Sequence, residues 1–162
     1  MRGNRLLISP YHSNDDWIEE IFDAIVRFNP DAIHSYPSCM EYPARYMSHA
    51  SRPQIKCQGV LLASEACSVQ QCELFSKYFT GHISVNYGLS ERTNLAIAHF
   101  TSDVDDLAFK LDDVYGVSEN RQDDEGYSEI VGTSYWNRTM PLIRYCTQDY
   151  GVIINDIEEA FG

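Results

Sequence analysis

Helical and strand patterns alternate along the first half of the chain. Over residues 14–28, apolar side chains recur at three- and four-residue spacing, which predicts a helix with one buried face. Two capping-box sequences, which begin at Ser38 and Ser68, predict two further helices. Short apolar runs predict strands at 32–36, 55–63 and 82–85. This order predicts an α/β fold whose doubly wound parallel sheet has helices on its faces and ligand sites at the carboxyl ends of its strands.

The second half of the chain is mainly β in character. Turn residues separate its short apolar runs, and the polar segment 118–126 is interpreted as an exposed loop. The pattern predicts an antiparallel or barrel-like portion that continues the parallel sheet. The expected strands are Ala96 to Phe100, Leu107 to Leu111, Val114 to Val117, Tyr127 to Thr133, Leu142 to Cys146 and Gly151 to Ile154.

Length and charge narrow the class of protein. A chain of 162 residues is expected to form one domain with a sizeable core. Its 24 acidic and 12 basic side chains give a net charge of −12, which disfavours nucleic acid and anionic membranes as partners. The longest aliphatic run, residues 60–63, is too short for a membrane span, and residues 1–10 do not fit a signal peptide. We expect a cytoplasmic chain.

Five cysteines are present, an odd number without a CxxC pair. This fits neither a disulfide framework nor a zinc knuckle, so reduced thiols are expected. A zinc site formed by Cys57, Cys67, Cys72 and a histidine stays open as an alternative.

The segment Asn86-Tyr87-Gly88-Leu89-Ser90-Glu91-Arg92 directly follows the strand predicted at 82–85. Gly88 is expected to permit a tight turn that presents an aromatic ring, a hydroxyl and a carboxylate together. These groups suit a magnesium nucleotide, since a ring stacks on a base and a carboxylate binds a hard cation. The alternative is a strand-to-helix turn with Ser90 as the cap and Glu91 as an acid of the first helical turn.

The motifs, taken in order, resemble those of the adenylate-forming superfamily. Within it, they are similar to the branch of phenylacetate–coenzyme A ligase and the capsule-biosynthesis, or CapK-like, proteins. The resemblance covers nearly the whole chain. The matching stretches are residues 5–12, 30–38, 64–66 (Ser-Glu-Ala), 87–92 and 140–150, the last containing Arg144-Tyr145-Cys146-Thr147-Gln148-Asp149.

The resemblance implies that ATP activates a small carboxylic acid, of which an aromatic acid is one option, to an acyl-adenylate. Transfer to a thiol such as coenzyme A usually follows. The implied nucleotide site, for ATP or AMP, is made of Ser64, Glu65 and Ala66 at the adenine pocket, Tyr87 and Gly88 beside the base, and Asp149 on the ribose hydroxyls. The implied catalytic residues are Ser90, near the phosphate, and Glu91, the Mg2+ ligand. Tyr36 and Pro37 fall at the acyl pocket, and His12 falls where acyl or thiol groups approach.

Two departures from the family pattern define the competing hypotheses. Cys146 stands where the family has an arginine between tyrosine and threonine, and the phosphate-binding loop and the C-terminal domain with its catalytic lysine are missing. We therefore expect residues 1–162 to be one incomplete domain, the central to C-terminal part of the large nucleotide-binding domain. About 1–95 would be α/β and about 96–162 mainly β. The isolated chain is expected to be inactive, and the alternative is a noncatalytic module that binds a nucleotide or a partner.

Overall fold

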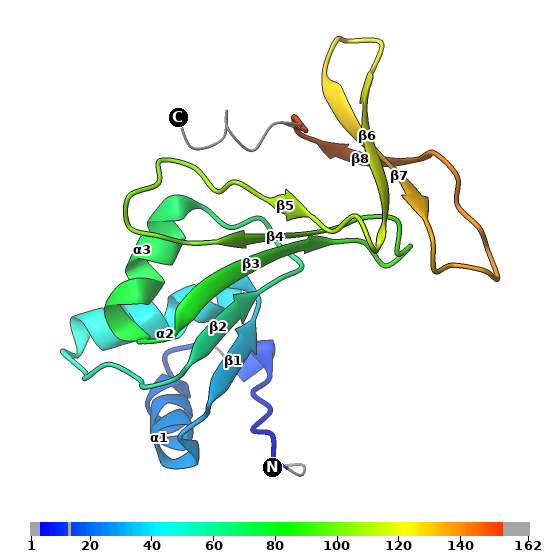
Figure 1. Ribbon diagram of the computed structural model, residues 1–162. Coiled ribbons are helices and arrows are strands. Elements are labelled where there is room, and N and C mark those ends of the chain that lie inside the picture. The colour runs from blue at the N-terminus through cyan, green and yellow to red at the C-terminus, as the bar shows by residue number, and fades with distance from the viewer. Residues whose placement is uncertain (1–3, 13, 154–162) are drawn as a thin grey trace. The chain divides into compact units, whose positions relative to one another are not determined.

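The computed structural model describes residues 4–12 and 14–153 (Figure 1). Their contacts divide the described residues into two compact units. Unit 1 takes its residues from Met1–Val85 and His99–Leu107, and unit 2 takes its residues from Asn86–Ala98 and Ala108–Gly162. The expectation of a single incomplete domain stays a prediction.

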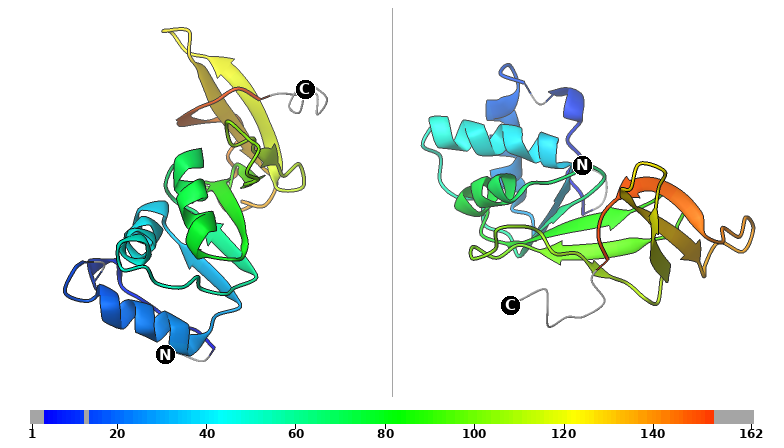
Figure 2. Two further views of the ribbon diagram at one scale, coloured as in Figure 1. Left: turned by 90° about the vertical axis from the view of Figure 1, so that its left-hand side faces the viewer. Right: turned by 90° about the horizontal axis from the view of Figure 1, so that it is seen from above.

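Three parallel strands form the sheet of unit 1. They are β1 (Ala32–Ser35), β2 (Gly59–Leu62) and β3 (His82–Gly88), and β3 continues into unit 2. Helix α2 (Pro37–His49) connects β1 to β2, and helix α3 (Val69–Tyr78) connects β2 to β3. Because both crossovers advance the strand order in the same direction, both helices lie on one face of the sheet, as the two views of Figure 2 show. The prediction of a parallel α/β portion is confirmed.

Two predicted elements, the helix at 14–28 and the strand at 55–63, begin later in the structure than predicted. Helix α1 spans Ile18–Phe28 rather than residues 14–28, because the side-chain oxygen of Asn14 accepts the N–H of Asp16 in a turn that precedes the helix. The helix ends at Asn29, whose φ of 51° stops it as expected. Strand β2 begins at Gly59, and Ile55 forms only an isolated bridge with Phe79.

The two capping boxes have different outcomes. At Ser68 the capping box is present, since its hydroxyl accepts the N–H of Gln71 and its own N–H donates to the Gln71 side chain. The capping box predicted at Ser38 is wrong. Pro37 opens α2, and the N–H and hydroxyl of Ser38 both donate to the Glu65 carboxylate, at 3.1 and 3.0 Å.

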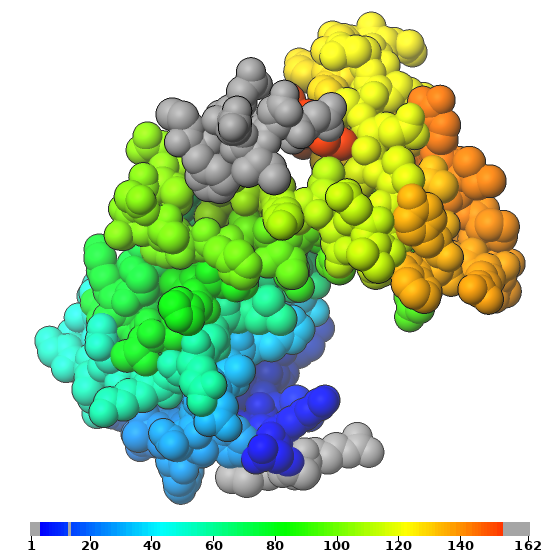
Figure 3. Space-filling model, viewed as in Figure 1, coloured from blue at the N-terminus to red at the C-terminus, as the bar shows by residue number. Residues whose placement is uncertain are grey.

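The core of unit 1 lies between α2, α3 and the parallel strands. In the space-filling view, the residues of this unit, drawn blue to green, pack against one another on the face that is shown (Figure 3). Buried hydrophobic side chains come from each of these elements. They include Met40, Ala44, Met47, Val60, Leu62, Cys72, Phe75, Ile83 and Val85.

Unit 2 is mainly β and confirms the antiparallel alternative. Strands β6 (Gly116–Gln122), β7 (Ser128–Ser134) and β8 (Tyr145–Tyr150) form a three-stranded antiparallel sheet that is open, not a closed barrel, in the described part of the chain. Strands β4 (Leu95–His99) and β5 (Lys110–Leu111) pair antiparallel at the end of the five-stranded mixed sheet.

The predicted loop at 118–126 is wrong over its first half. Residues 118–122 belong to β6, which is an edge strand of the three-stranded sheet. Most of its side chains are exposed to solvent, so the strand can be polar and still form. The turn that follows is held by Asp123, whose carboxylate accepts the N–H groups of Glu125 and Tyr127. Of the last predicted strand, residues 151–153 have no strand conformation, and Ile154 lies outside the described residues.

Within residues 4–12 and 14–153, none of the helices has the length and apolar character that crossing a bilayer requires.

Candidate active site

Strand β3 carries the first residues of the motif. Tyr87 and Gly88 complete the strand instead of lying in the turn, and Gly88 has no left-handed φ. The tight-turn role expected of Gly88 is therefore wrong. Arg92 takes the left-handed position, with φ 58°, and its N–H donates to the carbonyl of Leu89 at 3.0 Å.

Ser90 and Glu91 lie in this turn, beyond the carboxyl end of β3, as predicted. The chain then enters β4, so the alternative in which Ser90 caps a helix is wrong. The Ser90 side chain is exposed.

Tyr87 contacts the acid that the sequence analysis placed with it. Its hydroxyl donates to Oδ2 of Asp149 at 2.8 Å, although 62 residues separate the two positions. Burial of the ring, together with this hydrogen bond, raises the pKa of the Tyr87 hydroxyl well above its ordinary value. Two of the predicted nucleotide ligands are thus adjacent, and the remaining lone pairs of Asp149 can accept further O–H donors.

A bulge in β8 orients Asp149. Gln148 has a φ of 63°, and the register between β7 and β8 shifts at this point. The hydroxyl of Thr147 donates to the carbonyl of Ile130 at 2.7 Å and accepts the N–H of Asp149 at 3.1 Å. Backbone and side-chain bonds therefore fix the position from which the Asp149 carboxylate projects.

Glu129 on β7 holds the same bulge, and the sequence analysis missed it. Its side chain is only 5% exposed, yet it binds the Arg121 guanidinium at 2.7 Å and accepts the N–H of Gln148 at 3.1 Å. The available signal was an acid in the otherwise apolar run 129–131, where a buried charge needs partners.

Glu91 faces a second residue of β8. The hydroxyl of Tyr145 donates to Glu91 Oε1 at 3.3 Å, and the nearby negative charge raises the pKa of Tyr145. The side-chain amide of Asn137 donates to the Glu91 carbonyl at 3.4 Å. Magnesium is commonly held by one or two carboxylates together with phosphate oxygens, so this single carboxylate fits a Mg2+ that arrives with a nucleotide.

Thr93 and Asn94 anchor the turn to the three-stranded sheet. Both are buried, and the Asn94 side-chain amide donates to the Ser118 hydroxyl at 2.7 Å. A Cβ at Gly132 would overlap the side chains of both anchor residues. This close approach is possible only because Gly132 has no side chain.

An open hollow of about 490 Å³ adjoins the turn. Its wall includes the Arg92 guanidinium and the half-exposed ring of Trp136, whose indole N–H donates to the Val114 carbonyl at 3.0 Å. Asp112, Val114 and Tyr115 complete the lining. A cation and an indole ring therefore line one hollow at the residue that follows Glu91, which the sequence analysis did not anticipate.

The remaining predicted site residues belong to unit 1. Ser64 (φ 68°), Glu65 and Ala66 form the exposed segment after β2, and Glu65 is bound to Ser38. Their convergence with Tyr87 stays a prediction.

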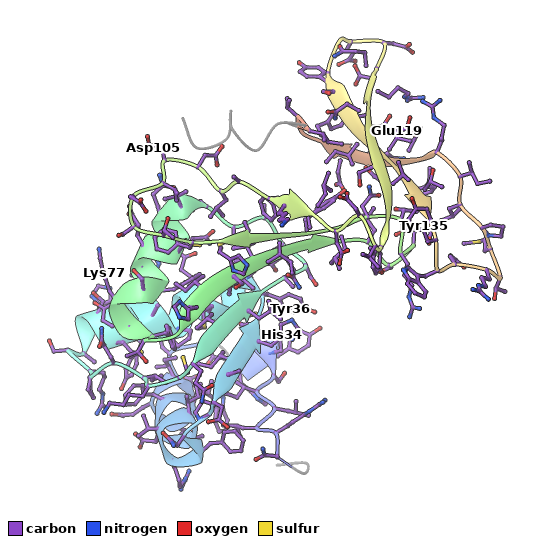
Figure 4. All side chains as sticks on the ribbon, viewed as in Figure 1. His34, Tyr36, Lys77, Asp105, Glu119 and Tyr135 are labelled. Atoms are coloured by element: carbon purple, nitrogen blue, oxygen red, sulfur yellow. The ribbon has the colours of Figure 1, made fainter. Side chains whose placement is uncertain are left out.

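The residues predicted to form the acyl pocket also belong to unit 1. Tyr36 lies where β1 gives way to α2, as Figure 4 shows, and it is 45% exposed. The next residue, Pro37, is buried as the first residue of that helix. His12 ends a 3-10 helix, with its ring 5.4 Å from that of Trp17. Their acyl and thiol roles stay predictions.

The cysteines are all free thiols. Cys67 and Cys72 lie close together, with their sulfur atoms 3.6 Å apart. However, no cluster of three or more His, Cys, Asp or Glu side chains suited to a metal occurs among residues 4–12 and 14–153. The zinc-site alternative built on Cys57, Cys67, Cys72 and a histidine is therefore wrong for the described residues.

Comparisons with known proteins place the fold. A scan against models of protein families finds no match, and a search of curated proteins finds none either. Among solved structures, the chain is similar to a mutant form of coronafacic acid ligase from Pectobacterium brasiliense, with a TM-score of 0.50 and 14% identity. The alignment covers 85% of this chain and 29% of the ligase chain.

At this identity the likeness shows a shared mixed α/β fold with part of a ligase. The fold class predicted from the sequence is confirmed, and the motif resemblance gains support at the level of the fold. The chain spans less than a third of the ligase that it matches.

Proposed function

We propose that the chain is part of an ATP-dependent ligase that activates a small carboxylic acid as an acyl-adenylate and transfers it to a thiol, with coenzyme A as the acceptor. The contact between Tyr87 and Asp149 carries the proposal. The motif resemblance and the fold of the ligase neighbour support it. The phenylacetate branch and an aromatic acid as the substrate belong to this proposal.

Tyr87 and Asp149 supply complementary halves of a nucleoside site. The Tyr87 ring offers a face for the adenine base, while its hydroxyl holds one oxygen of the Asp149 carboxylate. The free lone pairs of that carboxylate suit two ribose hydroxyls, which are O–H donors. Ser64, Glu65 and Ala66 are assigned to the edge of the adenine pocket, with Gly88 beside the base.

The turn after β3 supplies the phosphate end of the site. Glu91 is assigned to Mg2+, and the exposed hydroxyl of Ser90 is assigned to a phosphate oxygen. The Arg92 guanidinium, in the wall of the adjoining hollow, is suited to neutralise charge that develops as pyrophosphate leaves. Tyr36, Pro37 and His12 are assigned to the acyl and thiol side.

A second candidate function is a noncatalytic module that binds a nucleotide or a partner. Cys146 on β8 favours it, because a thiol replaces the cation that the family pattern has between Tyr145 and Thr147. Weaker charge stabilisation would permit binding without turnover.

Titration of the 162-residue chain with AMP, followed by amide NMR shifts, tests the nucleoside site. Stacking and ribose bonds each contribute only about 1 kcal/mol, so we expect saturable shifts around Tyr87 and Asp149 with a dissociation constant in the millimolar range. Asp149→Ala should remove them. The matched control is Asp113→Ala, an exposed acid of unit 2. Equal shifts in both variants would contradict the assignment.

Carboxylate-dependent ATP–pyrophosphate exchange tests the chemistry. We expect none from the 162-residue chain, because we place the phosphate-binding loop and the catalytic lysine outside it. A longer product of the gene should exchange, and Glu91→Gln or Asp149→Ala should lower its rate by about a hundredfold or more. Asp113→Ala again serves as the control. AMP binding by a longer product that does not exchange would favour the noncatalytic module.

A further inference from the structure

Two thiols of unit 1 lie in van der Waals contact at the beginning of α3. The sulfur atoms of Cys67 and Cys72 are 3.6 Å apart, five positions apart in sequence. Cys67 precedes the N-cap residue Ser68, and Cys72 is in the first turns of the helix. The described cysteines show no other contact between two sulfur atoms.

The two sulfur atoms differ in how solvent reaches them. Cys72 is completely buried against the core, whereas Cys67 is partly exposed in the segment that enters the helix. An external reagent can therefore reach Cys67 but not Cys72.

The contact also shifts the pKa values of the two thiols in opposite directions. The contact between the two sulfur atoms lowers the pKa of Cys67 and raises the pKa of Cys72. Because the thiolate is the nucleophile, Cys67, which is also the thiol that solvent reaches, is the reactive member of the pair.

We propose that Cys67 and Cys72 form a redox site in which a low-molecular-weight disulfide, such as oxidised glutathione, converts the pair into an intramolecular disulfide. The contact between the sulfur atoms, the one-sided access and the helix-entry position carry this inference. It does not depend on the proposed ligase function.

The reaction has two balanced exchange steps. The Cys67 thiolate attacks one sulfur of the reagent R–S–S–R, which forms a mixed disulfide at Cys67 and expels one R–S⁻. Cys72, after losing its proton, attacks the Cys67 sulfur and expels the second R–S⁻. The protein loses two electrons and two protons, and the reagent becomes two R–SH. Capping of Cys67 removes the thiolate whose hydrogen bond and charge raised the pKa of Cys72, while the two sulfur atoms stay in contact, so the second step follows the first.

The surrounding contacts keep the pair in place. The capping box between Ser68 and Gln71 fixes the helix entry, and the Gln71 side chain donates to Glu41 of α2 at 3.0 Å. Closing the bond requires the sulfur atoms to approach by roughly 1.5 Å, within reach of side-chain rotation. The new bond would tie Cys67, the residue that follows the segment 64–66, to Cys72 of α3.

Peptide mapping of the unaltered chain tests the site. The chain is incubated with oxidised glutathione, alkylated with iodoacetamide and cleaved after glutamate. Cleavage at Glu65 and Glu73 yields peptide 66–73, whose only cysteines are Cys67 and Cys72. We expect this peptide to be two hydrogens lighter than its reduced form and to carry no alkyl group. Alkylation of both thiols, or retained glutathione, would overturn the proposal.

Peptide 42–65 is the internal control, since it contains Cys57, which has no neighbouring sulfur. It should carry an alkyl group or glutathione and never show the loss of two hydrogens.

Two single variants assign the roles. Cys72→Ser should retain one glutathione on Cys67, because the resolving thiol is gone. Cys67→Ser should leave the buried Cys72 unmodified over the same time. Rapid glutathionylation of Cys72 in that variant, with a native circular dichroism spectrum, would contradict the assigned order of attack.

Discussion

The carboxylate of Glu129 accepts the backbone N–H of Gln148 at 3.1 Å, so a buried acid of β7 holds the left-handed residue of β8. The same carboxylate is paired with Arg121 at 2.7 Å. Asp149, the proposed ribose ligand, is the next residue. The geometry of the site therefore depends on a side chain that does not belong to the recognised motifs.

Glu129→Ala is expected to lower the free energy of unfolding by about 2 kcal/mol, since it removes hydrogen bonds to a charged, buried acceptor. Urea denaturation measures the change. Glu119→Ala is the control, because Glu119 is 40% exposed and its partner Arg144 is 3.5 Å away, so the loss should stay below about 1 kcal/mol. Equal losses would show that Glu129 has no special part in holding the bulge.

Gln148→Gly should raise the free energy of unfolding by about 1 kcal/mol, because glycine adopts the positive φ of 63° without a steric penalty. The bond to Glu129 survives, since it uses the backbone N–H. Gln122→Gly on the edge strand β6, where φ is not positive, should instead destabilise the protein. Urea denaturation of both variants decides the matter, and destabilisation by Gln148→Gly would contradict the account of the bulge.

Gly132→Ala should destabilise unit 2 by about 1–3 kcal/mol, because the added methyl group overlaps Thr93 and Asn94. The double variant with Asn94→Ala should recover part of this loss, which a double-mutant cycle detects. Gly59→Ala is the control, since its Cβ would meet its nearest neighbour at 3.9 Å. Strict additivity of the two changes would show that the predicted overlap is absent.

The stability of the protein should fall in strongly alkaline solution, in part through Tyr87. Its pKa is raised in the folded state by burial and by Asp149, so its contribution is fully present below the ordinary tyrosine pKa of about 10. As the pH rises above that value, the unfolded chain loses this proton first and the contribution declines. Tyr87→Phe should therefore show a shallower decline than the unaltered protein when unfolding free energies at pH 9 and pH 11 are compared. Identical declines would refute this role.

Local sequence patterns predicted the elements whose interactions are themselves local. The apolar residues that predict α1 are three or four positions apart in sequence. The capping partners Ser68 and Gln71 are likewise only three residues apart. Ser38 misled the prediction because its partner, Glu65, lies 27 residues away. The polar residues of β6 misled it because an edge strand needs little apolar character.

The candidate site was accessible to sequence reasoning only in part. The motif resemblance paired Tyr87 with Asp149, which periodicity alone could not do across 62 residues. No local sequence pattern indicated that Glu129 holds the bulge of β8 or that Gly132 leaves space for the Asn94 side chain. Both roles depend on residues that only the folded sheet brings together.

The division of the chain into units also bears on how this site is inherited. Unit 2 draws on residues 86–98 and resumes only at residue 108, and the stretch between them belongs to unit 1. The codons for Tyr87 and for Asp149 therefore flank a piece of the other unit. A recombination breakpoint anywhere between them separates the two halves of the site, so recombination transfers the intact site only together with that intervening stretch.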